Sequence, residues 1–259
     1  MTPAAGNLAG VSVIVPCLDE EEAIGPAVAA ILACGVGEVI VVDGNSRDRT
    51  AAHAQAAGAR VVSEARPGYG RALMTGIEAL GEACDLVVFI DGDGSDRPEM
   101  IPALVAPLRA GTADFVLGTR LAGPREPGSL SAAQLLAGHL AGLLIRLAYG
   151  VRFTDMSPFR ALRRDTLRAL GMREQGFGWN LEMQMRAAAS GLRCREVPVG
   201  QRCRQGGVSK VSGNLRVSVK VAWVLASTFL RLAATLRRER SQSGAPRGSG
   251  AAIVRGPRG

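Results

Sequence analysis

Two clusters of polar and acidic residues follow runs of apolar residues, and both could bind a metal ion or a phosphate group. The first is Asp-Gly-Asn-Ser at 43–46, after Glu-Val-Ile-Val-Val, and the second is Asp-Gly-Asp-Gly-Ser-Asp at 91–96, after Leu-Val-Val-Phe-Ile. Apolar runs of this kind, closed by Gly and Asp, are typical of interior strands of a parallel sheet. Ligands bind outside the carboxyl ends of such strands, so carboxylates there are placed for chemistry.

The spacing of Asp91 and Asp93 suits a hard divalent cation, Mg²⁺ or Mn²⁺. Mg²⁺ commonly takes one or two carboxylates together with substrate phosphates. Asp43, at the end of another strand, could accept hydrogen bonds from a base N–H or a ribose hydroxyl. Asp-Gly pairs also make ordinary polar turns, but two clusters on separate strands favour the functional interpretation.

The first strand is predicted over 11–16 and leads into a third acidic segment. Pro16 should end the strand because it cannot donate to the ladder, and Glu21 and Glu22 suit the positive end of the next helix. The turn at 16–20 is acidic rather than glycine-rich, which disfavours a Rossmann dinucleotide site. A sugar-phosphate nucleotidyltransferase is disfavoured on similar grounds, because it would want a basic, glycine-rich loop here.

The elements that must position these residues alternate along the chain, which predicts an α/β fold with a mainly parallel sheet flanked by helices. The expected strands are 11–16, 38–43, 59–63, 86–90, 114–118 and 194–199, and the expected helices are 20–34, 47–57, 71–83, 98–110, 132–149, 162–170 and 181–189.

Length and composition fit one such domain with two terminal extensions. The chain has 259 residues, 47% of them hydrophobic, and a net charge of +8. Five scattered cysteines and a start with no signal-peptide pattern predict a reduced, cytoplasmic protein. The expected organisation is a disordered N-terminus at 1–10, a catalytic domain at 11–214, an amphipathic helix at 215–236 and a basic disordered tail at 237–259.

The last two segments, 215–236 and 237–259, could contact a membrane. The apolar stretch inside 215–236 is bracketed by Lys220 and Arg231, so it is shorter than the roughly 20 residues of a spanning helix. We expect it to dock on the domain, on a partner or in the membrane interface, and a tilted span is the less favoured alternative. The tail carries six arginines against one glutamate, which suits solvent or an anionic lipid surface. Without aromatic residues for base stacking, it does not indicate nucleic-acid binding.

Taken in order, the motifs resemble family 2 glycosyltransferases of the GT-A fold, and within them the dolichyl-phosphate mannose synthase-like branch of polyprenyl-phosphate glycosyltransferases. The resemblance covers roughly residues 11–214. It is carried by Val-Pro-Cys-Leu-Asp-Glu-Glu-Glu (15–22), Val-Val-Asp-Gly-Asn-Ser-Arg-Asp-Arg-Thr (41–50), Asp-Gly-Asp-Gly-Ser-Asp-Arg-Pro (91–98), Gly-Thr-Arg (118–120), Thr-Asp-Met-Ser-Pro-Phe-Arg (154–160), Gly-Trp-Asn-Leu-Glu (178–182), and Arg204 followed by Ser209-Lys210. It implies a Rossmann-like nucleotide-binding half and an acceptor half.

The resemblance also implies roles for individual residues. Nucleotide binding falls to Pro16, Leu18, Glu20 and Asp43, although the family often has Tyr where Leu18 stands. The Asp91-Gly92-Asp93 segment would hold the metal and the donor, and Ser95 stands where the family often has Gln. Basic positions for phosphate binding match Arg120, Arg204 and Lys210, the last beyond a Gly206-Gly207 pair that suggests a mobile loop.

Asp155 and Glu182 are the candidates for a sugar contact or a general base, along with Asp93 as a catalytic residue at the metal. A phosphate acceptor is already ionised and needs no base, whereas a hydroxyl acceptor does. A turn cap for Asp155 and a helix-surface position for Glu182 are the alternatives. In this branch the helix matching 130–145 often opens with a basic residue, which is absent from Ala-Gln-Leu-Leu-Ala-Gly-His at 133–139.

The expected function is therefore inverting, metal-dependent transfer of a sugar from a nucleoside diphosphate sugar to an acceptor, preferably a polyprenyl phosphate. The alternatives are a glycan or small-molecule hydroxyl acceptor and a non-catalytic nucleotide-sugar-binding homologue. The protein would be cytoplasmic and could make peripheral contact with the inner face of the membrane.

Overall fold

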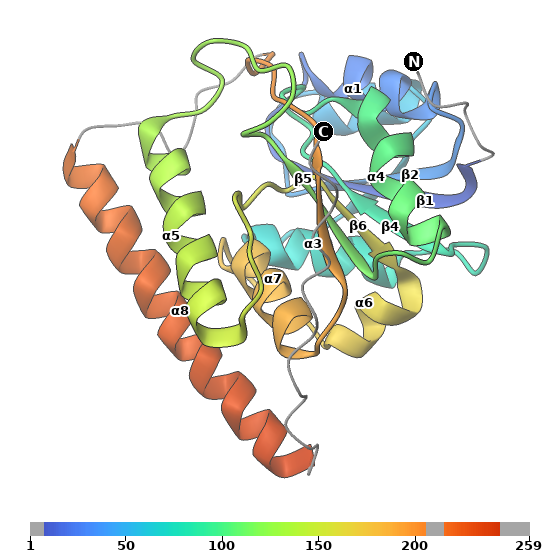
Figure 1. Ribbon diagram of the computed structural model, residues 1–259. Helices are drawn as coiled ribbons and strands as arrows, with labels where there is room; N and C mark the ends of the chain where they lie inside the picture. Colours follow the sequence, from blue (N-terminus) through green and yellow to red (C-terminus); the bar gives the residue numbers. More distant parts are fainter. Residues whose placement is uncertain (1–7, 206–214, 244–259) are drawn as a thin grey trace.

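The computed structural model describes residues 8–205 and 215–243, which form an α/β fold around a central sheet (Figure 1). Within the described residues the strands are β1 (Leu8–Cys17), β2 (Val36–Asp43), β3 (Arg60–Ser63), β4 (Leu86–Phe89), β5 (Phe115–Thr119), β6 (Arg160–Arg163) and β7 (Cys194–Pro198). The helices are α1 (Ile24–Leu32), α2 (Thr50–Ala56), α3 (Tyr69–Glu78), the 3₁₀ turn η1 (Pro98–Met100), α4 (Ile101–Arg109), α5 (Ala132–Tyr149), α6 (Arg164–Leu170), α7 (Trp179–Ala189) and α8 (Leu215–Ser243).

The strands form one sheet in the order β3-β2-β1-β4-β6-β5-β7. Every neighbouring pair is parallel except those that involve β6, which runs antiparallel to both β4 and β5. The predicted GT-A architecture with a mainly parallel sheet is confirmed.

Two apolar cores cover the two faces of the sheet, because successive side chains of a strand point to opposite faces. Ile14, Ile40 and Phe89 belong to the core shared with α3, α5, α7 and α8. Val13, Val41 and Val88 belong to the core shared with α1, α2 and α4. Helices on both faces of the sheet leave its carboxyl edge as the place for a site.

Helices α5 and α8 lie side by side at the margin of the first core (Figure 1). Small residues let α5 approach the chain beneath it: a Cβ added at Gly142 would lie 2.1 Å from the carbonyl oxygen of Phe153. By length and composition, α5 is the one helix of the described residues apolar enough to cross a membrane, with 33% of its 18 residues buried inside the protein.

The structure differs most from the expected elements in three places. In addition, the predicted helices 20–34 and 71–83 are shorter, at Ile24–Leu32 and Tyr69–Glu78. The predicted helix 162–170 begins only at Arg164, because Arg160–Arg163 form β6 between two other strands. This pairing depends on neighbours far away in sequence, so local periodicity does not reveal it. At the N-terminus, β1 already begins at Leu8, whose side chain is buried, within the segment predicted to be disordered.

The third difference is that α8 continues to Ser243, seven residues beyond the predicted end of the amphipathic helix. Buried Leu236 and the ion pairs of Glu239 with Arg173 and Arg186 tie this last part to the domain. Disorder was predicted from the Gly, Ser, Pro and Arg content of the whole segment 237–259, but its first residues are mainly Arg and Glu, which are good helix formers. The rest of the predicted tail, 244–259, and residues 1–7 lie outside the described residues.

Candidate active site

The site begins with the carboxyl ends of β1, β2 and β4, which the parallel register brings to one edge. Cys17 pairs with Asp43, and Ile14 with Phe89. The loops that follow β1 and β2 are tied together: the backbone N–H of Glu20 donates to Thr50 Oγ1 at 2.8 Å, and that of Arg47 donates to Asp19 Oδ1 at 2.8 Å. The acidic segment after β1 and the cluster after β2 thus form one connected rim.

The four residues predicted to bind the nucleotide lie on this rim. Pro16 is inside β1 rather than at its end, because the strand continues to Cys17. Leu18 is 39% exposed, which leaves an apolar surface beside Gly44. The Asp43 carboxylate is largely buried and accepts from the backbone N–H of Ser46 at 3.3 Å. These positions are compatible with nucleotide binding, which stays a prediction.

The second cluster forms a tight loop at the end of β4. The backbone N–H of Asp91 donates to Asp96 Oδ2 at 3.1 Å, and that of Ser95 donates to Asp93 Oδ1 at 2.9 Å. Gly92 packs closely on β1, where an added Cβ would lie 3.2 Å from the Cβ of Cys17. Local bonds therefore fix the loop and leave other carboxylate oxygens of Asp91 and Asp93 for a ligand.

The loop concentrates negative charge. Burial raises the pKa of Asp91 well above its ordinary value, and the charges of Asp93 and Asp96 raise it further. Burial, together with the charge of Asp93, raises the pKa of Asp96 to about 7. Crowded carboxylates with raised pKa values are stabilised by a positive charge, so a cation would relieve the repulsion in this loop.

A divalent cation fits the donor set, although the described residues contain no group of three or more His, Cys, Asp or Glu side chains arranged to hold one. Asp91 and Asp93 could supply two carboxylates, and the phosphates of a donor would complete the shell, as is common for Mg²⁺. The excess of negative charge in the loop supports this assignment.

Arg204 reaches the same loop from the far end of the chain. Its guanidinium pairs with Oε1 of Glu20, and its Nε lies 3.6 Å from Oδ2 of Asp93. The neighbouring backbone contacts the same loop, since the N–H of Gln205 donates to the carbonyl oxygen of Asp93 at 3.0 Å. The predicted phosphate-binding Arg204 therefore lies against two predicted site carboxylates, whereas Lys210 lies outside the described residues.

Arg120 and Asp155 form a second, more buried pair. Nε and Nη2 of Arg120 donate to the two carboxylate oxygens of Asp155 at 2.8 and 2.7 Å, and the backbone N–H of Arg120 donates at 2.9 Å. Burial by itself raises the pKa of Asp155, but the bonds and charge of Arg120 outweigh it and lower the pKa. A carboxylate with both oxygens engaged and a lowered pKa is better suited to orient Arg120 than to accept a proton.

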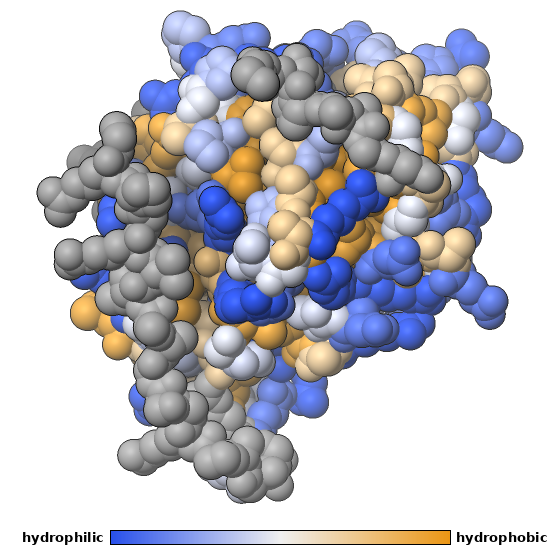
Figure 2. Space-filling view, turned by 45° about the vertical axis from the view of Figure 1, so that its right-hand side comes forward, coloured by the Kyte–Doolittle hydropathy of each residue, from blue (hydrophilic) through white to orange (hydrophobic). Residues whose placement is uncertain are grey.

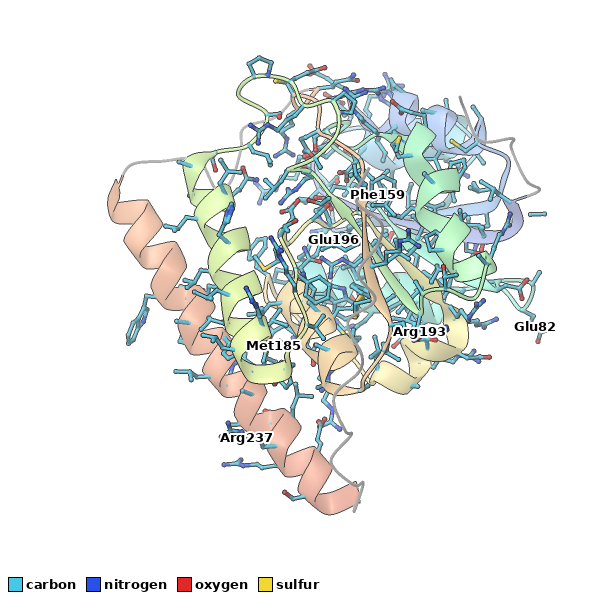
Figure 3. The ribbon with its side chains drawn as sticks, viewed as in Figure 1. Glu82, Phe159, Met185, Arg193, Glu196 and Arg237 are labelled. Atoms are coloured by element: carbon cyan, nitrogen blue, oxygen red, sulfur yellow. The ribbon has the colours of Figure 1, made fainter. Side chains whose placement is uncertain are left out.

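The segment before Asp155 is held by Glu196 of β7, labelled near the centre of Figure 3. Its carboxylate accepts from the backbone N–H and the hydroxyl of Thr154 at 2.7 and 2.9 Å. The carbonyl oxygen of Asp155 accepts from Gln184 Nε2 at 2.9 Å. Asp155 is therefore fixed by two elements, α7 and β7, that both lie far from it in the sequence.

Glu182 has partners that favour a structural role over that of general base. Its side chain is 1% exposed and accepts from the backbone N–H groups of Arg173 and Glu174 and from Nε of Arg186. The alternative of a helix-surface glutamate is wrong, because the first turn of α7 is buried beneath the loop at 171–178. Glu182 holds this loop.

Two aromatic residues at the site were not found from the sequence. The hydroxyl of Tyr69 donates to Asp91 Oδ1 at 3.2 Å, and the Tyr69 ring stacks on Phe177 with centroids 6.4 Å apart. Two glycines near Tyr69 let another part of the chain come close. A Cβ at Gly68 or Gly70 would lie within 2.4 Å of a backbone oxygen of the 171–178 loop.

Fold and site together define a GT-A-type protein with an acidic loop at the carboxyl edge of its sheet. The chain belongs to glycosyl transferase family 2, whose model matches residues 12–171. It is 41% identical over 211 residues to an uncharacterized glycosyltransferase of Mycobacterium tuberculosis, covering 81% of this chain and 93% of the relative.

Two further similarities concern the branch of glycosyl transferase family 2 to which the chain is related. An undecaprenyl-phosphate mannosyltransferase of Micrococcus luteus is 33% identical over 243 residues, covering 86% of this chain and 97% of that protein. The crystal structure of glucosyl-3-phosphoglycerate synthase from M. tuberculosis in complex with Mn²⁺, uridine-diphosphate and glucosyl-3-phosphoglycerate matches with a TM-score of 0.66 and 27% identity, covering 86% and 79% of the two chains. The first of these supports the polyprenyl-phosphate glycosyltransferase branch.

Proposed function

We propose that this glycosyltransferase transfers a sugar, with inversion, from a nucleoside diphosphate sugar to a polyprenyl phosphate. An oxygen of the acceptor phosphate attacks the anomeric carbon of the sugar. The bond from that carbon to the β-phosphate oxygen breaks, and the nucleoside diphosphate leaves. Both phosphate groups are anionic before and after the step, so no proton has to move.

The observation that carries the choice of acceptor is the state of Asp155 and Glu182. A hydroxyl acceptor needs a carboxylate to take its proton, and these were the two candidates. Both are 2% exposed or less, and each is paired with an arginine, Arg120 or Arg186. An acceptor that is already ionised needs no such base, which favours a phosphate.

The remaining residues have roles that follow from their positions. Asp91 and Asp93 would hold a Mg²⁺ or Mn²⁺ ion, which neutralises the charge that develops on the departing diphosphate. Arg204, next to both Glu20 and Asp93, can exchange these carboxylates for a phosphate oxygen. Arg120 is held rigid by Asp155 and contributes fixed positive charge near Asp91 and Asp96. Lys210 would act as a further point charge.

The likeness to the undecaprenyl-phosphate mannosyltransferase supports this acceptor, since it extends over 97% of that protein. The likeness to glucosyl-3-phosphoglycerate synthase supports a second candidate, transfer to the hydroxyl of a small phosphorylated molecule. That alternative requires a base other than the two engaged carboxylates, or a rearrangement that frees one of them.

The test is an acceptor panel with a set of nucleoside diphosphate sugars and Mn²⁺, followed by mass spectrometry of the products. The acceptors are a short-chain polyprenyl phosphate, the matching polyprenol and 3-phosphoglycerate. We expect transfer to the polyprenyl phosphate and none to the polyprenol, which has the same chain but only a hydroxyl. Transfer to 3-phosphoglycerate or to the polyprenol instead would overturn the proposal.

A further inference from the structure

The outer surfaces of α5 and α8 are unusually apolar for exposed helices. On α5, Leu136, Leu143 and Leu147 are 49%, 53% and 76% exposed. Their spacing of seven and four residues places them in one stripe along the helix. A protein in water gains nothing from such a stripe, and exposed apolar patches commonly mark an interaction site.

The exposed face of α8 continues this pattern and then becomes basic. Trp223 and Leu230 are 73% and 68% exposed and lie seven residues apart on the side opposite buried Leu225 and Phe229. About two turns beyond Leu230, Arg237 and Arg238 are exposed as well (Arg237 is labelled in Figure 3). Figure 2 shows apolar residues, in orange, reaching the surface at the left-hand edge, the side on which Figure 1 draws α5 and α8.

The distribution of acidic residues discriminates between possible partners. Helix α5 contains no Asp or Glu, and α8 contains only Glu239. Glu239 turns inward to pair with Arg173 and Arg186, at 3.0 and 2.9 Å. The described outer faces of both helices therefore carry apolar groups and positive charge with no negative charge, as in helices that bind anionic lipid.

From these observations we infer that α5 and α8 form a docking face for an anionic lipid surface, on which the helices lie without crossing it. Trp223 would sit at the headgroup level, where Trp is enriched, and the leucines would enter the acyl boundary. Crossing is disfavoured for α5, because its other face of Ala137, Gly138, Ala141 and Gly142 is buried in the domain.

The docking face is joined directly to the candidate active site. Arg231 of α8 pairs with Glu174 in the 171–178 loop, and a Cβ at Gly178 would lie 3.0 Å from Thr228 of α8. The same loop carries Phe177, which stacks on Tyr69 beside Asp91. A lipid surface under α5 and α8 would therefore lie against the loop that borders the site.

The experiment is co-sedimentation of the full chain with vesicles of phosphatidylcholine alone or mixed with phosphatidylglycerol, without donor or acceptor. We expect binding to the anionic vesicles only. Arg237→Glu with Arg238→Glu should weaken the partition by at least about 30-fold, because each basic residue lost near such a surface contributes roughly a fivefold factor and the added glutamates are repelled. Arg168→Glu with Arg195→Glu makes the same charge change on α6 and β7 and should leave the partition within about threefold.

The apolar part is tested separately by Leu143→Gln with Leu147→Gln. Both side chains are exposed, so the melting temperature should be kept while vesicle binding falls. Equal binding of this variant and the unchanged protein would overturn the proposal. So would a dimer, seen by light scattering without lipid, that this variant dissociates, since the stripe would then bind a second copy. Because no sugar transfer is measured, failure here leaves the proposed function untouched.

Discussion

The phenol of Tyr69 and the carboxylate of Asp91 are joined by a hydrogen bond of 3.2 Å at the centre of the acidic loop. Burial, followed by the charge of Asp91, raises the pKa of Tyr69 well above its ordinary value. The phenol therefore stays protonated and donates to Oδ1 of Asp91, and the second carboxylate oxygen, Oδ2, is not used by this bond. Tyr69 thus orients a predicted metal ligand.

Tyr69→Phe should weaken Mn²⁺-dependent donor binding while keeping the fold. The variant preserves the ring that stacks on Phe177 and removes only the hydroxyl, so the free energy of unfolding should fall by about 1 kcal/mol or less. We expect donor affinity to drop about five- to tenfold, the equivalent of a hydrogen bond that contributes about 1 kcal/mol. Isothermal titration calorimetry with and without Mn²⁺ measures this, and unchanged affinity would remove Tyr69 from the site.

Asp93→Asn should abolish metal-dependent donor binding without unfolding the protein. The Asp93 side chain lies at the sheet edge and is 16% exposed, so the apolar cores do not depend on its charge. In the unchanged protein, a donor at about 100 times its Kd should add about 2.7 kcal/mol to the free energy of unfolding. Thermal unfolding with Mn²⁺ and donor should show this shift in the unchanged protein but not in the variant.

Asp85→Asn is the matched control for Asp93→Asn, because Asp85 is exposed at the opposite end of β4. It should keep the full donor-induced shift. A normal shift in Asp93→Asn, or loss of the shift in both variants, would contradict the assignment of Asp93.

The Arg120–Asp155 pair should make stability depend on pH in a defined direction. Arg120 holds the pKa of Asp155 below its ordinary value of 3.8. The native state therefore binds fewer protons than the unfolded state in this range, so the pair's contribution is present above pH about 4 and is lost as the pH falls through the lowered pKa. Asp155→Asn should cost about 3–5 kcal/mol at pH 7, because it leaves Arg120 buried without its partner.

The measurement for this pair is chemical denaturation of both proteins between pH 7 and pH 3. The difference in unfolding free energy should be largest at pH 7 and shrink toward pH 3. A difference that stays constant with pH would show that Asp155 acts through its shape and not through its charge.

Glu239→Gln should destabilise the protein, although the sequence places Glu239 in what reads as a disordered tail. Arg186, with a 7% exposed side chain, would lose one of its two carboxylate partners and keep Glu182. We expect a loss of about 1–3 kcal/mol, measured by thermal unfolding. Glu82→Gln, in the exposed turn at the right of Figure 3, is the control and should change little. Equal melting temperatures for the two variants would mean that the end of α8 does not stabilise the domain.

Whether an element can be predicted from the sequence depends on how far apart in the chain the interacting residues lie. Strands such as 38–43 and 86–90 have local patterns of apolar and β-branched residues, and their ends locate Asp43, Asp91 and Asp93 correctly. The strand at 160–163 has no such pattern, because it is defined by its pairing with β4 and β5.

The sequence also did not allow the partners of individual side chains to be predicted. The residues around Asp155 and Glu182 in the sequence do not indicate that Arg120 and the 171–178 loop are their partners. Two buried, paired carboxylates were therefore candidates for a sugar contact or a general base. Tyr69 was missed for the same reason: only the fold brings the segment after β3 to the end of β4. The role of such a side chain depends on tertiary contacts, and these contacts cannot be predicted from the local pattern of one sequence.

The position of β6 has a consequence for the order in which the protein assembles. Residues 86–89 pair with residues 160–163, which in turn pair with 115–117, so β4 and β5 have no contact as neighbouring strands. Pairing over such sequence separations is slow, because closing a long loop costs conformational entropy before any stabilising contact forms. We therefore expect hydrogen-exchange pulse labelling to show protection of β1 and β2 first and of β6 last. The acidic loop and Arg120 would then meet only when this late strand inserts, so a nascent chain ending before residue 160 would hold both predicted cation ligands but no complete site.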